Sequence, residues 1–168
     1  MTRARSIANF GDGIATADID DGAVTAAKIG SLPAGSVLQV AQATKTNNQT
    51  IATSTKTALS GLSVTITPTS ASSKFLLSVS IAVQSNAALG GTTVYFYRNS
   101  TQLGWPSDFT VYPMVSGENI IWSDSILDAP ATASAITYSC YAATTSGVSM
   151  SFNPNAGHAR LTVMEIAG

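Results

Sequence analysis

Charged residues are scarce in this sequence. Only 10% of its 168 residues are Asp, Glu, Lys or Arg, whereas typical soluble domains have about 25%. The formal net charge is −1, so the chain lacks the basic field with which proteins bind nucleic acids or anionic membrane surfaces. A small domain with so few charges has a poorly solvated surface. We therefore expect much of that surface to be covered by copies of the chain itself.

Cysteine is nearly absent, and long apolar runs are missing. The single cysteine, Cys140, cannot form an intrachain disulfide. It shares a parity with Ile136 and Tyr138, which predicts a small buried side chain rather than a reactive thiol. No apolar run approaches the roughly 18 residues of a membrane span, so we expect no membrane insertion. The basic residues after Met1 are not followed by an apolar segment, so we expect no secretory signal.

Residues suited to catalysis or metal binding are few and scattered. One histidine, His158, and one cysteine give no zinc site of the usual ligand type. No phosphate-binding glycine loop, nucleophile elbow or spaced-carboxylate calcium loop is present. We expect a protein that is not an enzyme and needs no cofactor or metal. The alternative is a glycosidase-type acid pair formed by two of Asp108, Glu118, Asp124, Asp128 and Glu165, whose spacing does not favour it.

Strand-like alternation is abundant, and it is clearest between Lys74 and Gln84. Large apolar side chains occupy every second position there, at Phe75, Leu77, Val79, Ile81 and Val83. Successive side chains of a strand point to opposite faces, so one face of this segment is a wall of the core. At about 3.3 Å per residue the segment spans roughly 35 Å. That length suits the central strand of an all-β domain.

Shorter strand-like segments, separated by turn residues, flank this strand. We count roughly eight to ten in all, a pattern typical of an antiparallel β-sandwich or jelly roll. Two pairings between sequence neighbours are predicted. Asn99 and Ser100 form a two-residue turn between 94–98 and 101–103, and the turn at 144–147 pairs 134–143 with 148–152.

The segment from Val94 to Arg98 is bulky on both faces. Val94 and Phe96 fall on one side, and Tyr95 and Tyr97 fall on the other. A strand that is apolar on both faces is usually buried on both. In a two-layered sandwich only one face meets the core. We therefore predict that Tyr95 and Tyr97 lie in a trimer interface.

Residues 105–114 combine three aromatics with two prolines. Proline fixes the backbone and suppresses regular structure, while aromatic faces offer contact area to sugar rings. A carboxylate beside them can accept hydrogen bonds from glycan hydroxyls. The segment is thus a candidate receptor-binding loop, although the same rings could instead fill the core or line a trimer axis. Its candidate binding residues are Trp105, Asp108, Phe109 and Tyr112.

Residues 1–30 differ in composition from the rest of the chain. The segment Asp12–Ala17 recurs nine residues later as Asp21–Ala26, with the same Asp, Gly, Thr and Ala at four of its positions. Two copies of so short a unit cannot bury a core alone, so the repeat needs partner chains or a scaffold. A flexible leader or a short capped helix is the alternative. Since Ser31–Gly35 has the composition of a hinge, we predict an attachment or stalk segment at 1–30 and a β-sandwich head at 31–168.

Three segments, Asp21–Ile29, Pro33–Val40 and Leu161–Gly168, resemble small fibre or virion structural proteins of tailed bacteriophages, particularly marine and cyanobacterial phages. The resemblance implies a homotrimeric virion appendage, assembled in the host cytoplasm. Its jelly-roll head would be similar in outline to tumour-necrosis-factor and complement-type heads. The N-terminal segment is expected to dock on a tail, baseplate or capsid protein, and the head to bind a host surface glycan. A purely structural capsid or baseplate decoration is the alternative.

Overall fold

The computed structural model describes residues 32–87, 90–104, 110–111, 115–145, 148–155, 157 and 159–168. The chain divides into Met1–Pro33 and Ala34–Gly168, and all strands described below belong to the second unit. None of the described residues lies in a helix, so this part of the chain contains no helical membrane span. The predicted stalk conformation of residues 1–30 lies outside the described residues.

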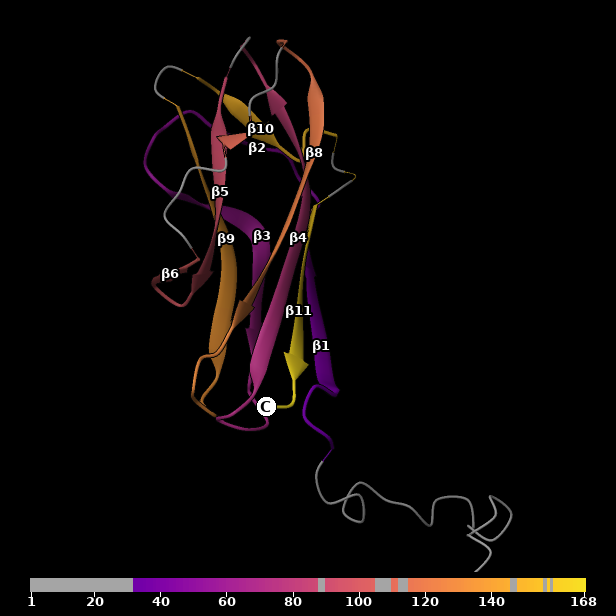
Figure 1. The fold of residues 1–168 in the computed structure, drawn as a ribbon. Coiled ribbons are helices and arrows are strands. Elements are labelled where there is room, and N and C mark those ends of the chain that lie inside the picture. The colour runs from indigo at the N-terminus through magenta and orange to yellow at the C-terminus, as the bar shows by residue number, and fades with distance from the viewer. Residues whose placement is uncertain are drawn as a thin grey trace, which may run out of the picture. The chain divides into compact units, whose positions relative to one another are not determined.

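The described strands form two antiparallel sheets that face each other (Figure 1). Sheet A contains β1 (Val37–Thr44), β2 (Gln49–Ile51), β4 (Lys74–Ser85), β8 (Asn119–Asp128), β10 (Met150–Phe152) and β11 (Ala159–Ile166). Sheet B contains β3 (Thr57–Ile66), β5 (Thr92–Arg98), β6 (Thr101–Leu103), β7 (Thr110–Val111) and β9 (Ile136–Thr144). Eleven strands are therefore described. This exceeds the prediction because the two-residue β7 has no signal in the sequence.

Six of the ten connections between successive described strands pass from one sheet to the other. Across sheet A the order is β8, β4, β11 and β1, and β10 and β2 prolong the lines of β11 and β1. Across sheet B the order is β6, β5, β9 and β3. Such interleaving of two four-strand layers is the jelly-roll arrangement. The predicted fold class, an all-β antiparallel jelly-roll sandwich, is confirmed.

The predicted central strand is β4. It pairs with β8 along one edge and with β11 and β10 along the other. Its alternate side chains Phe75, Leu77, Val79, Ile81 and Val83 are at most 1% exposed. Burying each such side chain contributes about 1.5–3 kcal/mol relative to exposing it. The same alternation leaves the other face of β4 pointing away from the core.

The turn at Asn99 and Ser100 is confirmed. β5 and β6 pair antiparallel across it, and Asn99 has a φ of 53°, a left-handed conformation in which asparagine is enriched. The Asn99 side-chain oxygen accepts a hydrogen bond from the Thr137 N–H at 3.0 Å. This bond ties the turn to β9.

The predicted pairing of 134–143 with 148–152 is wrong. β9 lies in sheet B between β3 and β5, whereas β10 lies in sheet A between β4 and β2. At the end of β9 the Thr144 N–H donates to the Thr53 carbonyl at 2.9 Å instead of to a following strand. The turn residues marked a change of direction, but the chain uses it to change sheets.

Candidate functional site

The predicted receptor-binding residues Trp105, Asp108, Phe109 and Tyr112 lie outside the described residues. Their assignment to a glycan-binding loop stays a prediction. The same holds for His158. Within the described ranges, no three His, Cys, Asp or Glu side chains gather closely enough to hold a metal ion.

Tyr95 and Tyr97 lie on the outward face of sheet B, where their own chain covers part of each ring. The Tyr97 ring centroid is 4.2 Å from that of Tyr141. The Lys56 ammonium sits 4.6 Å from the centroid of the Tyr95 ring, a cation–π contact. Both tyrosines remain half-buried rather than fully covered. Their role in a trimer interface stays a prediction.

The outward face of sheet A carries an apolar band at the end nearest the C-terminus. One cross-strand row runs Leu127, Leu76, Met164, Val40 through successive partners of β8, β4, β11 and β1. The adjoining row adds Ile166 and its partner Val37. Three members of this apolar band are more than half exposed: Val37 at 54%, Val40 at 57% and Leu127 at 56%. The band therefore crosses the full width of the sheet in contact with solvent.

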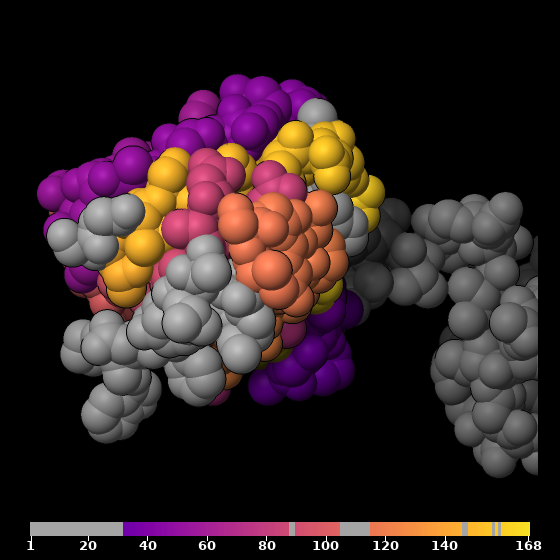
Figure 2. Space-filling model, turned by 90° about the horizontal axis from the view of Figure 1, so that it is seen from above, coloured from indigo at the N-terminus to yellow at the C-terminus, as the bar shows by residue number. Residues whose placement is uncertain are grey.

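Apart from Ile121, which is 55% exposed, the rest of this outward face is small, polar and weakly charged. Above the apolar band, the next row pairs Ser125 with Ser78 and Thr162, and one more row brings Arg160 beside Ser80. Figure 2 shows that the start of β8 forms an exposed surface next to the end of β4. On this face of the described strands, Lys74 and Arg160 are the two charged side chains.

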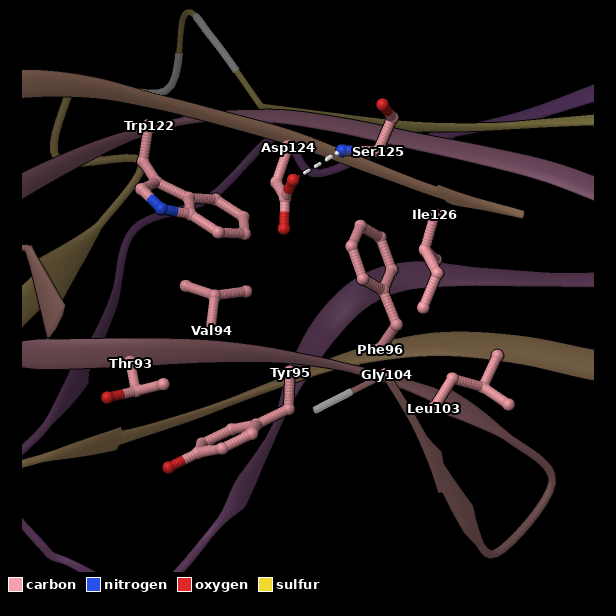
Figure 3. Close-up of a pocket in the computed structure, with 10 residues that line it drawn as sticks. All are labelled: Thr93, Val94, Tyr95, Phe96, Leu103, Gly104, Trp122, Asp124, Ser125 and Ile126. Carbon is pink, nitrogen blue, oxygen red and sulfur yellow. Dashed lines mark hydrogen bonds between the residues drawn. The ribbon is translucent and has the colours of Figure 1, made fainter. Parts of the chain in front are cut away.

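A pocket of about 290 Å³ opens between the two sheets where β8 faces β5 and β6. Trp122, Asp124 and Ile126 project into it from β8, and Val94 and Phe96 project from β5 (Figure 3). Leu103 and Gly104 of the β6 end also contribute to its wall. The Tyr95 ring points to the other side of β5. Among the described strands this edge pocket marks the open side of the sandwich, because β1 and β3 close the opposite side.

Asp124 is the charged group of the edge pocket. Its carboxylate accepts a hydrogen bond from the Ser125 N–H at 2.8 Å. In the described part of the chain no cation pairs with it, since the one ion pair there joins Arg98 to Asp128. The walls are mostly apolar, and the exposed Asp124 carboxylate gives the edge pocket a negative charge.

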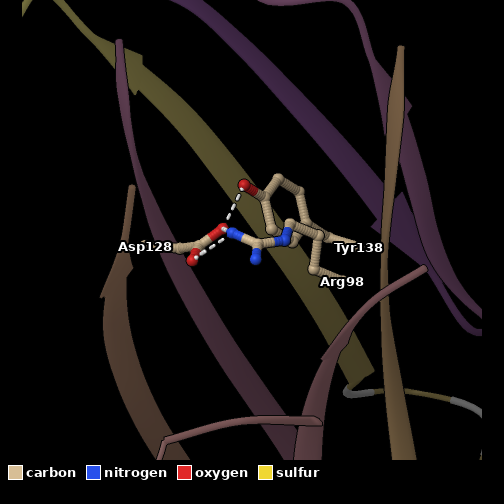
Figure 4. A network of polar contacts seen from close by, with 3 residues as sticks. All are labelled: Arg98, Asp128 and Tyr138. Carbon is tan, nitrogen blue, oxygen red and sulfur yellow. Dashed lines mark hydrogen bonds and ion pairs between the residues drawn. The ribbon is translucent and has the colours of Figure 1, made fainter. Parts of the chain in front are cut away.

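A partly buried polar network joins the two sheets near one end of β8 (Figure 4). One guanidinium nitrogen of Arg98 donates to both oxygens of Asp128, at 2.8 and 2.9 Å. The Tyr138 hydroxyl donates to Asp128 Oδ2 at 2.7 Å. Burial, together with this hydrogen bond, raises the pKa of Tyr138, so its hydroxyl remains a proton donor. These three residues fasten β8 of sheet A to β5 and β9 of sheet B.

A second buried carboxylate, Glu165, lies two strands away from Asp128 in the same cross-strand row. Its Oε1 accepts hydrogen bonds from the Thr69 N–H at 2.7 Å and the Thr69 hydroxyl at 2.6 Å, and Gln39 donates to Oε2. Burial alone would raise the pKa of Glu165. Hydrogen bonds from Thr69 and Gln39 outweigh it and hold that pKa below its ordinary value. The carboxylate is a structural tie between β11, β1 and the β3–β4 connection.

Lys45 and Cys140 are buried within the fold. The Lys45 ammonium donates to Asn47, Gln49 and the Ser60 carbonyl at 2.9–3.1 Å, which accounts for its three protons. Burial lowers its pKa. Burial also raises the pKa of Cys140 to about 12, so the thiolate is not populated near neutral pH. The predicted buried role of Cys140 is confirmed.

No family model and no curated protein matches this chain. Solved structures that resemble it include one of the infectious bursal disease virus Gx strain, with a TM-score of 0.43 and 9% identity over 76% of this chain and 36% of the other. A mutant VP2 protein of infectious bursal disease virus, in derived T=1 particles, gives a TM-score of 0.40 and 7% identity over 77% and 36%. The chain thus spans about a third of the length of either structure. The jelly-roll assignment rests on the strand order and not on these likenesses.

Proposed function

We propose that this chain is a virion structural protein of a tailed phage, and that its jelly-roll head associates as a homotrimer. The observation that carries the association is the apolar band on the outward face of sheet A. Contiguous exposed apolar surface of this kind marks an interaction site on a soluble protein. Scarce surface charge supports the same conclusion, because a closed assembly of copies covers surface that few charges protect.

Closure of the trimer limits which surfaces meet. In a three-fold ring each subunit contacts its two neighbours along directions about 60° apart. The two outward faces of a sandwich point about 180° apart, so stacking one on the other produces an open filament. The open edge of the sandwich lies about 90° from the face of sheet A, which is much nearer to ring geometry. We therefore propose that the β8 edge of one subunit covers the apolar band of the next.

We also propose how the trimer is placed on the particle. Residues 1–30 attach the trimer to a tail, baseplate or capsid protein, and the head presents residues 105–112 to a host surface glycan. Many copies on one particle convert weak sugar contacts into avidity. The second candidate is a capsid or baseplate decoration with the same trimer and no receptor. Electron microscopy of the labelled protein on the particle separates these two locations.

Leu127→Asp tests the association. Leu127 is 56% exposed, so a carboxylate there remains solvated in the monomer but is buried against apolar side chains in the trimer, where an unpaired charge is strongly unfavourable. Sedimentation should show a trimer for the wild type and a folded monomer for Leu127→Asp. Val115→Asp is the matched control, because Val115 is 62% exposed outside the strands, and it should remain trimeric.

Sedimentation also distinguishes a trimer interface on sheet A from one on sheet B. If the contact instead uses the face of sheet B, as the sequence predicted, Tyr95→Asp and Tyr97→Asp will dissociate the trimer and Leu127→Asp will not. That outcome would move the interface from the apolar band to the tyrosines.

A further inference from the structure

We propose that the edge pocket is the receptor for Arg160 of a second copy of this chain. The inference rests on the proposed trimer and specifies one contact within it. Arg160 projects from β11 on the outward face of sheet A, and Asp124 projects into the pocket of the open edge. When the edge of one subunit covers the sheet A face of the next, the guanidinium enters the pocket and pairs with the carboxylate.

The chemistry of the edge pocket suits a planar cation on an apolar stem. Its walls are the indole of Trp122 and the side chains of Phe96 and Ile126, and Asp124 supplies one carboxylate. A guanidinium stacks on aromatic faces and binds a carboxylate through two parallel hydrogen bonds. The methylenes of an arginine stem are compatible with the apolar walls. A sugar fits less well, because most of its hydroxyls would lose water without gaining a partner.

The described Lys and Arg side chains that are free to enter the edge pocket of a neighbour both lie on sheet A. Lys45 is buried and bonded to three oxygens, and Arg98 is paired with Asp128. Lys56 lies over Tyr95. Lys74 and Arg160 remain, and neither makes a side-chain hydrogen bond or ion pair within the described part of the chain. Both lie on the face that the edge of a neighbour would cover.

The strand register selects Arg160 over Lys74. Rotation about an axis parallel to the strands keeps every residue at its own level along that axis. Asp124 pairs with Val79, which pairs with Leu161, so Arg160 lies one residue, or about 3.3 Å, from the level of Asp124. Lys74 precedes Val79 on β4 by five residues, about 17 Å along the strand. Only Arg160 is at the height of the edge pocket.

A charge swap tests the contact. Asp124→Arg and Arg160→Asp each place like charges in the interface, and each should raise the concentration at which the trimer dissociates by about tenfold or more. The double variant restores opposite charges and should return this concentration to within about threefold of the wild type. Asp124→Arg combined with Lys74→Asp is the matched control and should not recover. Both positions are exposed in one chain, so circular dichroism should show every variant folded.

Three results would overturn the proposal. Single variants that leave the trimer unchanged would remove the edge pocket from the interface and leave the trimer standing. A monomeric wild type would overturn both this contact and the proposed function. The third result uses butylguanidinium as a probe of the edge pocket. If this compound binds the wild type but not Asp124→Asn, and the double charge-swap variant does not recover trimer association, the pocket binds a cation from another source.

Discussion

Asp128→Ala should lower the free energy of unfolding by about 3 kcal/mol, the lower end of the range found when one partner of a buried ion pair is removed, because the Arg98 side chain remains 27% exposed. The change leaves the Arg98 guanidinium without its anion and the buried Tyr138 hydroxyl without its acceptor. It also removes the one ion pair that joins sheet A to sheet B within the described residues. Denaturant unfolding followed by circular dichroism measures the loss.

Two variants distinguish the loss of the Asp128 network from the general effect of removing a charged group. Tyr138→Phe removes one hydrogen bond and keeps the ring, which lies 5.5 Å from that of Phe75, so it should lose only about 1 kcal/mol. Lys74→Ala removes an exposed charge at the start of β4 and should change stability by no more than about 0.5 kcal/mol. A loss below about 1 kcal/mol for Asp128→Ala would show that solvent replaces the network.

Glu165→Gln should destabilise the protein by about 2 kcal/mol at neutral pH. The Thr69 N–H and hydroxyl both point at Oε1, and Gln39 donates to Oε2. A glutamine amide group presents its own N–H to one of these donors, so at least one buried group loses its acceptor. Chemical unfolding at several pH values provides the measurement.

The pH dependence identifies the carboxylate as the cause. The pKa of Glu165 is lower in the folded chain than its ordinary value of 4.5. Its contribution is therefore complete above that ordinary value and disappears as the pH falls through the lower folded pKa. The difference between wild type and Glu165→Gln should shrink below about pH 4.5. A difference that stays constant down to pH 2 would contradict this account.

Alternation in the sequence was sufficient to predict the jelly roll and most of its core. Phe75 to Val83 on β4, and Ile136 to Cys140 on β9, follow the two-residue period, and their inward members are buried. The period specifies which face of a strand is buried and not which strand lies beside it. For that reason the partner of β10 was predicted incorrectly, since nothing local distinguishes a hairpin from a crossover to the other sheet.

The candidate sites were much harder to predict, because they depend on register across strands that are distant in sequence. Leu127, Leu76, Met164 and Val40 come from four segments, and each is an ordinary apolar residue in its own segment. Asp124 was recognised in the sequence only as one of several scattered acids. Its position between Trp122 and Ile126 on the inward side of β8 was a usable signal, since a charge between two core-facing residues requires an opening or a partner.

The association state of the wild-type protein tests the central claim most directly. The chain mass is 17.2 kDa. Sedimentation equilibrium of the full chain at micromolar concentration should give a single species of about 52 kDa, as three-fold closure requires. A single species at 17.2 kDa, with the apolar band left in water, would contradict the account.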